Sequence, residues 1–398
     1  MKNINKKQWF FAFFLLVAIS IWVGVIFLGD GSYADESDHL RQIHRFMKGN
    51  YAVMSQLTTI PGYHMAVATI ANFFHDVSSQ QLRLISLVLS LFSIPVFYLI
   101  AKKMEARDPL MKTLQYIYLP ITFLYFPLMY TDIFSLLWVM LAFYFARRKK
   151  YSWSAVFLFI SLLVRQNNIV WGAFLWVYAY VLENGFVLSW EKISLHLKRG
   201  AGYVFTAVLF LIFVWLNKGV SIGDRERQQV GFFLGNIYFF LALVGFLFLP
   251  IFIAGCRKIK FDKRLAWGAG IGLVAALAFI FFPPAVHEYN MKMKFLRNII
   301  LWFAYHQYIW AYALAIFLGC VTLACMKLEK NALTFLPFVA ISLMPSLLVE
   351  QRYAIIPLVL ILLLRRESSF KTESALLAYF FVLSGGLVCM LLRVGIFF

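Results

Sequence analysis

Six clusters of polar residues interrupt the long apolar runs of this chain, and their side chains suit acid–base and phosphate chemistry. Carboxylates can take a proton from a hydroxyl, and guanidinium groups match the oxygens of a phosphate. Such groups are costly beside apolar runs unless they bind or react with something, so each cluster is a candidate site. The clusters are Asp35-Glu36-Ser37-Asp38-His39, Tyr130-Thr131-Asp132, Arg165-Gln166-Asn167-Asn168, Asp224-Arg225-Glu226-Arg227, His287-Glu288 and Glu350-Gln351-Arg352-Tyr353.

The first cluster places carboxylates at the start of a predicted helix. Asp35 and Glu36 open this helix, and His39 and Gln42 follow at spacings that put them on the same face. One interpretation makes Asp35, or else Glu36, a general base at a membrane surface. The other makes these acids, Asp38 included, simple helix caps that the helix dipole favours.

The next clusters are shorter and lie deeper between apolar runs. Asp132 stands in a tight turn, where an acid is either functional or a cap of the following helix. Arg165, Gln166 and Asn168 interrupt an otherwise apolar stretch. Burying these three costs several kcal/mol without partners, so they line a cavity in which Arg165 binds phosphate, or they form an ordinary loop.

The last clusters combine both charges. Asp224, Arg225 and Glu288 belong to mixed-charge loops, which are either substrate contacts or solvated surface. Glu350 and Arg352 form either a structural ion pair or a phosphate clamp in which Glu350 orients Arg352. Thr58 and Thr59 precede a Pro-Gly pair that marks a turn or a helix start.

The elements that must hold these clusters are membrane helices. The 398 residues are 62% hydrophobic and only 14% charged, a balance that leaves too few polar residues to cover a soluble domain. Apolar stretches near the length that crosses roughly 30 Å of hydrocarbon recur along the chain. We expect an all-α polytopic integral membrane protein with one domain over 1–398, a helical outer loop near 30–80, and about thirteen spans. These lie near 9–29, 82–101, 113–128, 132–146, 153–164, 169–182, 203–216, 232–255, 265–283, 299–325, 331–348, 354–364 and 374–392.

The distribution of charge assigns a side to each loop. The net charge is +19, but the basic residues occupy short loops between spans, which argues against nucleic acid. Every second loop is basic, which is the positive-inside pattern. The basic groups fall at 2–7, 102–112, 147–150, 192–199, 257–264, 327–330 and 365–371. The N-terminus is therefore predicted to be cytoplasmic, and all six polar clusters are predicted to share the opposite face.

These residues resemble the polytopic glucosyltransferases that add the terminal α-1,2-linked glucose to the lipid-linked oligosaccharide of the endoplasmic reticulum, within the wider GT-C class. That family's motifs appear here in order, over about residues 30–360. They read Asp35-Glu36-Ser37-Asp38-His39-Leu40-Arg41-Gln42, Thr58-Thr59-Ile60-Pro61-Gly62, Tyr130-Thr131-Asp132, Arg165-Gln166-Asn167-Asn168, Gly223-Asp224-Arg225 and Glu350-Gln351-Arg352-Tyr353. Three of them depart from the family: Ile60 replaces a proline, Asn167 a threonine and Gln351 a proline.

The resemblance implies an inverting transfer of a hexose, glucose above all, from a polyprenyl- or dolichyl-phosphate sugar to a glycan or lipid-linked oligosaccharide. It implies Asp35 as the base with Glu36 second, and Arg165 and Arg352 as phosphate ligands, with no metal and no cofactor. The candidate substrate-binding residues are Asp38, His39, Gln42, Thr58, Thr59, Tyr130, Asp132, Arg165, Gln166, Asn168, Asp224, Arg225, Glu288, Glu350, Arg352 and Tyr353. Tyr33, Tyr63, Tyr130 and Tyr353 are candidates to stack on sugar rings or to form an interfacial belt.

One late family motif is poorly preserved, since only Glu288 plausibly matches its acid. The chain is also short for the eukaryotic enzymes. We therefore expect a bacterial homologue in the cytoplasmic membrane that uses undecaprenyl or another polyprenyl phosphate, with an endoplasmic reticulum enzyme as the alternative. Other interpretations are a transferase for mannose or arabinose, and a transporter or flippase, although the chain shows no internal repeat of the kind transporters carry.

Overall fold

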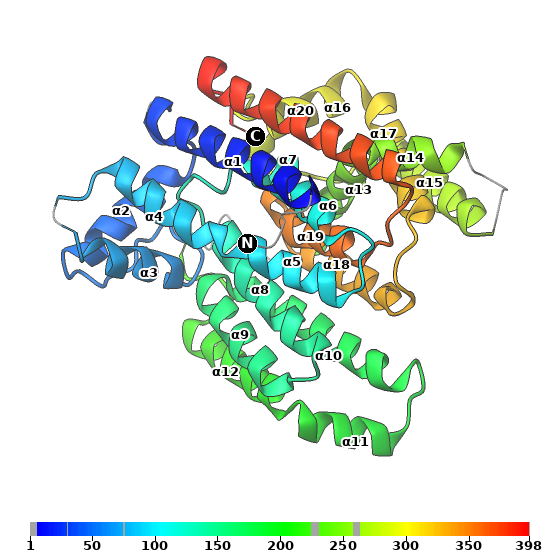
Figure 1. Ribbon diagram of the computed structural model, residues 1–398, viewed down its shortest axis with the longest axis horizontal. Helices are drawn as coiled ribbons and strands as arrows, with labels where there is room; N and C mark the ends of the chain where they lie inside the picture. Colours follow the sequence, from blue (N-terminus) through cyan, green and yellow to red (C-terminus); the bar gives the residue numbers. More distant parts are fainter. Residues whose placement is uncertain (1–5, 30, 75, 224–230, 258–262, 398) are drawn as a thin grey trace.

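The computed structural model describes residues 6–29, 31–74, 76–223, 231–257 and 263–397 (Figure 1). Within these ranges the chain is helical, with isolated β-bridges and no strand, so the all-α prediction is confirmed there. The first half contains α1 (Lys6–Leu28), α2 (Glu36–Met47), α3 (Gly62–Ala71), α4 (Ser79–Leu91), α5 (Ser93–Lys103), α6 (Pro109–Ile117), α7 (Pro120–Phe123), α8 (Thr131–Arg147), α9 (Tyr151–Val164), the 3-10 helix η1 (Gln166–Asn168), α10 (Ile169–Asn184) and α11 (Trp190–Arg199). The second half contains α12 (Ala201–Asn217), α13 (Gly235–Leu247), α14 (Leu249–Cys256), α15 (Lys263–Phe281), η2 (Glu288–Met291), α16 (Leu296–His306), α17 (Ile309–Cys325), η3 (Lys330–Thr334), α18 (Phe335–Leu343), η4 (Gln351–Ala354), α19 (Ile355–Leu364) and α20 (Phe370–Val394).

Among the described helices, four are long and apolar enough to cross a bilayer, or seven if each bent pair counts as one span. Every expected span coincides with a helix or a helix pair, while the number of thirteen crossings stays a prediction. Two expected spans are sharply bent: α13 meets α14 at 67° and α16 meets α17 at 113°. Pro250, in the first turn of α14, has no N–H to continue the preceding helix, which accounts for the first bend.

The helices pack into one bundle (Figure 1). The first and last helices, α1 and α20, run side by side, and both contact α6. The α17 helix packs along α13 and α15, and α8 packs along α5 and α9. The α2 and α3 helices pack on each other at one end of the bundle, to the left in Figure 1, and place the first predicted loop there.

The loops that carry the basic groups meet at one end of the bundle. Lys7 forms an ion pair with Asp108 at 2.7 Å, and Lys112 donates to the carbonyl oxygen of Arg365 at 2.8 Å. Arg147 pairs with Glu329 at 3.3 Å. With the bond from the N–H of Arg366 to the carbonyl oxygen of Lys327 at 2.7 Å, these contacts join five of the seven basic segments that the charge pattern assigns to one side.

The polar clusters that the structure describes meet at the other end. Arg352 pairs with Asp35 at 2.9 Å, and the Gln166 side chain donates to the carbonyl oxygen of Thr58 at 2.6 Å. The α19 helix connects the two ends, because η4 precedes it and Arg365 follows it. It is buried along nearly all of its ten residues, which span about 15 Å at the α-helical rise. An apolar layer therefore separates two polar ends.

Candidate active site

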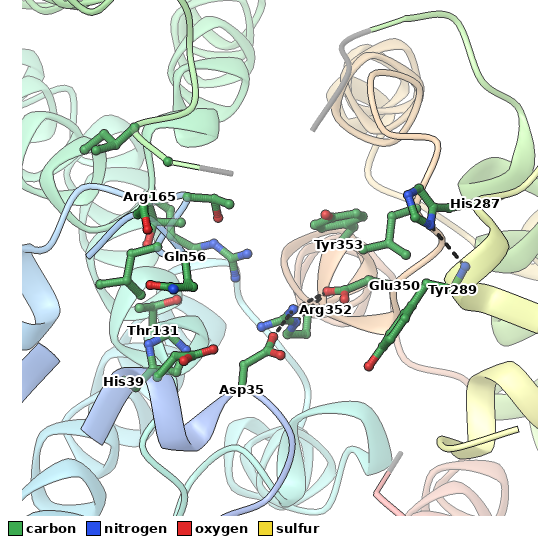
Figure 2. Close-up of a pocket in the computed structure, with 18 of the residues that line it drawn as sticks. Asp35, His39, Gln56, Thr131, Arg165, His287, Tyr289, Glu350, Arg352 and Tyr353 are labelled. Carbon is green, nitrogen blue, oxygen red and sulfur yellow. Dashed lines mark hydrogen bonds and ion pairs between the residues drawn. The ribbon is translucent and has the colours of Figure 1, made fainter. Parts of the chain in front are cut away.

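A cavity of about 960 Å³ opens at the end of the bundle where the polar clusters meet (Figure 2). One wall comes from α2, the loop before α3 and the end of α9, and the facing wall comes from η2 and η4. The lining residues are Asp35, Asp38, His39, Ser55, Gln56, Leu57, Thr58, Thr59, Thr131, Arg165, Ile222, Gly223, His287, Glu288, Tyr289, Lys292, Arg297, Leu348, Glu350, Arg352 and Tyr353. The cavity thus draws on segments that are more than 300 residues apart in the chain.

Asp35 lies between the two walls (Figure 2). It occupies the N-cap position of α2, yet its carboxylate accepts no capping hydrogen bond from that helix. Instead, Oδ2 accepts from Nη2 of Arg352 at 2.9 Å, and about half of the side chain (52%) remains exposed. The carboxylate is therefore ion-paired and open to the cavity, and it does not cap the start of α2.

Arg352 is held by a chain of charges on the facing wall. Its Nε donates to Oε2 of Glu350 at 2.6 Å, and its guanidinium lies 5.7 Å from the ring centre of Tyr130. The other oxygen of Glu350 accepts from Nη2 of Arg297 at 3.3 Å. Because Glu350 is buried between two guanidinium groups, it fixes the direction in which Arg352 faces the cavity.

Arg165 supplies a second guanidinium from the other wall. It follows the last residue of α9 with an extended backbone and forms an ion pair with the buried Asp132. The rest of the guanidinium points into the space between the walls (Figure 2). Asp132 does not line the large cavity, and its carboxylate holds the guanidinium of Arg165.

Glu36, the second candidate base, is enclosed rather than exposed. Its oxygens accept from Nε and Nη2 of Arg83 at 2.9 and 2.7 Å. They also accept from the backbone N–H groups of Tyr33 and Met129, both at 3.0 Å. The side chain is fully buried and does not line the cavity, so the geometry leaves it no contact with a substrate hydroxyl.

Three amide side chains of the candidate set lie behind the cavity walls and form hydrogen bonds there. Gln42 donates to the carbonyl oxygen of Ala52 and accepts from the N–H of Met54. Gln166 holds the Thr58 carbonyl, and Asn168 donates to the hydroxyl of Ser135 at 2.7 Å. None of the three amides lines the large cavity. Gln42 and Gln166 hold the loop before α3, which does line it, whereas Asn168 links α8 to the end of α9.

Most of the tyrosines expected at sugar rings are buried elsewhere. Tyr33, Tyr63 and Tyr130 are all at most 9% exposed and do not line the cavity. The Tyr130 hydroxyl donates to the carbonyl oxygen of Tyr33 at 2.7 Å. Of the four expected rings only Tyr353 lines the cavity, together with Tyr289, which the sequence did not single out.

His39 lines the cavity and contacts a second buried histidine. Its Nδ1 lies 2.8 Å from Nε2 of His64 on α3. Burial, and then the positive charges of Arg352 and Arg165, lower the pKa of His39 to about 3. Burial also holds the pKa of His64 well below its usual value. Both rings are therefore neutral at ordinary pH.

Of the remaining candidates, four line the cavity and two lie outside the described residues. Asp38, Thr58, Thr59 and Glu288 line the cavity. Asp224 and Arg225 lie outside the described residues. The cavity adds eleven lining residues that were not candidates: Ser55, Gln56, Leu57, Thr131, Ile222, Gly223, His287, Tyr289, Lys292, Arg297 and Leu348. Most of these residues lie in or next to the polar clusters, so their closeness to a cluster in the sequence could have indicated them. Nothing in the sequence singled out His64.

In the part of the chain that the structure describes, no three or more His, Cys, Asp or Glu side chains gather closely enough to hold a metal ion. The charged groups that line the cavity are four carboxylates and four cations: Asp35, Asp38, Glu288 and Glu350, and Arg165, Lys292, Arg297 and Arg352. The cavity therefore holds fixed positive charges next to an equal number of carboxylates.

Comparison with known proteins gives a consistent set of relatives. The DIE2/ALG10 family model matches residues 30–189 and 182–363. Several proteins named Dol-P-Glc:Glc(2)Man(9)GlcNAc(2)-PP-Dol alpha-1,2-glucosyltransferase are similar to this chain. The one from Mus musculus is 23% identical over 82% of either chain, and the one from Candida albicans is 21% identical over 90% of either chain. A crystal structure of ArnT from Cupriavidus metallidurans, bound to undecaprenyl phosphate, aligns over 98% of this chain and 77% of its own, with a TM-score of 0.47 and 14% identity.

Proposed function

The chain belongs to the DIE2/ALG10 family, and we propose that it moves glucose from a polyprenyl- or dolichyl-phosphate sugar to a glycan or a lipid-linked oligosaccharide. It is a membrane glycosyltransferase that uses a lipid-phosphate sugar, as its relatives are. The observation that carries the specific proposal is that an open carboxylate, Asp35, lines the same cavity as two guanidinium groups, Arg165 and Arg352, and contacts the second of them. Residues 1–398 form one catalytic membrane domain, and the loop over 30–80 supplies its acid.

Asp35 is the base of the proposed reaction. The oxygen of the acceptor hydroxyl attacks the anomeric carbon of the donor, and Asp35 takes the hydroxyl proton. The bond from that carbon to the phosphate oxygen breaks, and its electron pair leaves with the phosphate. Attack on the side opposite the phosphate turns a β-linked donor into an α-linked product.

Arg165 and Arg352 stabilise the leaving phosphate in this proposal. Arg165 uses one nitrogen for Asp132 and has further N–H groups on the side that faces the cavity. Planar guanidinium groups bind two phosphate oxygens at once, and their charge is fixed over the whole ordinary pH range. Two such groups neutralise the leaving phosphate, so the proposed reaction needs no metal, and a chelator should leave its rate unchanged.

Arg352 contacts the proposed base, Asp35, and is also a proposed ligand of the donor phosphate. It therefore links donor binding to proton transfer. Without substrate its Nη2 lies between Asp35 and Glu350, at 2.9 and 2.5 Å. A donor phosphate that takes this N–H group competes with Asp35 and leaves Glu350 in place. Donor binding would therefore release Asp35 from Arg352, so that its carboxylate can take the proton of the acceptor hydroxyl.

The proposed active site faces away from the cytoplasm. The basic loops meet at the opposite end of the bundle, and the positive-inside rule puts such loops in the cytoplasm. Lys292 adds an exposed cation at the cavity end, where it suits an anionic lipid phosphate. We place the protein in a bacterial cytoplasmic membrane, or in the endoplasmic reticulum if the source is eukaryotic.

The test is transfer by the purified protein in detergent or liposomes. Polyprenyl-phosphate glucose, mannose and arabinose, each with a labelled sugar, are supplied with a glycolipid extract as acceptor, with and without EDTA. We expect label to move from the glucose donor to the acceptor at an EDTA-independent rate. Transfer from mannose or arabinose alone would change the donor, and no transfer from any lipid-phosphate sugar would overturn the proposal.

A further inference from the structure

An apolar groove lies on the outside of the bundle, between its first and last helices. The groove, of about 380 Å³, is lined by residues of α1 and α20 and by Met111 of α6, a helix that both of them contact. Phe10, Phe13 and Val382 line it and are exposed on the surface. Both wall helices are long and apolar enough to cross a bilayer, so the groove faces the lipid.

The packing of the bundle fixes the walls of this groove. Phe14 of α1 and Phe381 of α20 meet edge to face, with ring centres 5.9 Å apart. Both rings also contact Tyr118, which follows α6. The stretch of α1 that lines the groove, from Phe10 to Val17, rises about 10 Å along the helix. The groove is therefore a fixed apolar surface on which a hydrocarbon chain can lie.

A polar recess adjoins the groove, at the end of the bundle where the basic loops meet. This recess, of about 100 Å³, shares Met111 with the groove. Lys7 and Glu373 line the recess about one helical turn before Phe10 and Leu377, which line the groove or lie along it. An apolar groove beside a charged recess matches an amphiphile that has a hydrocarbon chain and a polar head.

Both kinds of charge line the recess and reach its surface. Lys7 pairs with Asp108 at 2.7 Å, yet its side chain is 62% exposed. The Arg107 side chain is exposed too, and its guanidinium donates to the carbonyl oxygen of Ser368 at 3.2 Å. Glu367 accepts from the backbone N–H groups of Arg107 and Asp108, which hold its carboxylate at the recess. A head that carries a positive and a negative charge therefore finds partners for both.

We propose that the groove and the recess bind one phospholipid with a zwitterionic, primary-amine head, as in phosphatidylethanolamine. The lipid belongs to the leaflet on the side of the basic loops, which is the proposed cytoplasmic side. One acyl chain lies in the groove, Lys7 and Arg107 bind the phosphate, and Glu367 accepts from the ammonium. The carboxylates of Asp108 and Glu367 disfavour a head that is only anionic, and a quaternary amine has no N–H group to donate.

Native mass spectrometry of the purified full-length chain in detergent counts the bound lipids. The delipidated protein is titrated with phosphatidylethanolamine, phosphatidylcholine or phosphatidylglycerol, all with the same acyl chains. We expect one phosphatidylethanolamine to bind at least about tenfold more tightly than either of the others, the usual value of one hydrogen bond to a charged group. If phosphatidylcholine or phosphatidylglycerol binds as tightly, the proposal is wrong.

Two alanines of α20 provide a matched pair of variants. Ala378 lines the groove, whereas Ala375 is exposed on the same helix outside it. Ala378→Trp fills the groove and should weaken the tight site by at least about tenfold, while Ala375→Trp should bind the lipid as the wild type does. If Ala378→Trp does not purify as a monodisperse protein, Ala378→Leu replaces it. Equal binding by the two alanine variants would place the lipid elsewhere and refute the site.

A variant of Glu367 tests the contact with the head. Glu367→Gln keeps an oxygen for the two backbone N–H groups but loses the charge that faces the ammonium. The preference for phosphatidylethanolamine over phosphatidylcholine should fall to about threefold, the value of one neutral hydrogen bond. An unchanged preference would remove Glu367 from the head.

The mass of the complex reports lipid binding without any sugar transfer. Failure of this inference therefore leaves the proposed function in place. A protein that binds the lipid but transfers no sugar would overturn the proposed function and support the lipid site.

Discussion

Asp35 and Glu36 are neighbours in the chain but have opposite surroundings. Asp35 is half exposed and has one cationic partner, Arg352. Glu36 is fully buried, with Arg83 and two backbone N–H groups bonded to it. The carboxylate that the site can use is therefore the one that the fold leaves incompletely bonded.

This contrast predicts that Glu36→Gln destabilises the protein more than it slows the chemistry. The change leaves the buried guanidinium of Arg83 without its counter-charge, which costs about 3 kcal/mol or more of folding free energy. We expect a clear drop in the thermal unfolding midpoint in detergent, while kcat of the protein that remains folded stays within a few-fold. An unchanged midpoint together with lost turnover would make Glu36 a reacting group after all.

Arg352 is predicted to act mainly on the donor. Arg352→Ala removes a charge-assisted contact to phosphate, and such contacts are worth about 1.5–3 kcal/mol, or roughly 10- to 100-fold in affinity. We expect the donor KM to rise by about that factor, with a smaller effect on the acceptor KM. Steady-state kinetics with each substrate varied in turn will test this, and an unchanged donor KM would remove Arg352 from the phosphate site.

The neutral histidines predict a loss of stability in mild acid. The pKa of His39 falls from 6.5 in the unfolded chain to about 3 in the fold, so the unfolded chain binds more protons between these values. Stability is therefore fully present above about pH 6.5 and declines as the pH falls toward 3, by up to roughly 1.4 kcal/mol per pH unit. The charged and titratable groups around this ring are Asp35 before α2, Asp38 on α2, His64 on α3, Tyr130 before α8, Arg165 after α9 and Arg352 in η4.

Thermal unfolding between pH 4 and 8 measures this slope in the wild type and in His39→Gln. The variant should lose less stability than the wild type as the pH falls. Equal slopes would mean that other groups cause the acid sensitivity and that His39 is not held neutral.

At the scale of elements, the start of α3 shows how closely the walls are fitted. Gly62 begins α3, and a Cβ built there would overlap the backbone carbonyl of Leu163, near the end of α9. Backbone cannot move aside as a flexible side chain can. The turn with Pro61 thus needs glycine for close approach rather than for a special backbone angle.

We therefore predict that Gly62→Ala pushes α3 away from α9 and disturbs His64, Thr58 and Thr59 together. Both the unfolding midpoint and kcat/KM should fall, the latter by about tenfold or more, since small displacements of a positioned site are costly. Gly24→Ala in α1 is the matched control, because a Cβ there meets nothing within 4 Å. Equal behaviour of the two variants would contradict the close packing of α3 on α9.

The sequence predicted the helices well because each apolar run carries its own signal. The expected ranges near 132–146 and 153–164 correspond to α8 (Thr131–Arg147) and α9 (Tyr151–Val164). The bend of 113° between α16 and α17 was not predicted, since it follows from packing between distant segments and has no proline at the break. Local composition indicates a helix but not its direction in the bundle.

The site was predicted in part for a similar reason. Polar clusters in apolar surroundings pointed to Asp35, Arg165 and Arg352, all of which line one cavity. The partners that decide which groups stay open, such as Arg83 for Glu36, come from helices far along the chain. Such pairings depend on tertiary structure, so residue type alone did not distinguish the enclosed Glu36 from the open Asp35.

At the scale of the whole molecule, two polar ends are separated by the apolar α19. The end opposite the cavity has its own buried network, in which Arg365 pairs with Glu373 at 2.6 Å and donates to Gln115 at the same distance. These contacts join α6 to α20 and lie far from Asp35. Both ends are thus held by ion pairs, and the pairs at one end surround the large cavity.

The central claim is that this hollow end transfers a sugar with Asp35 as the base, and single-turnover transfer by Asp35→Asn tests it most directly. We predict that the rate falls by about 10²- to 10⁴-fold, the usual value of a general base, while donor affinity stays within a few-fold. The matched control is Asp76→Asn, which changes an exposed acid of the same outer loop outside the cavity and should leave both quantities unchanged. An Asp35→Asn protein that transfers sugar at a rate near that of the wild type would contradict the account.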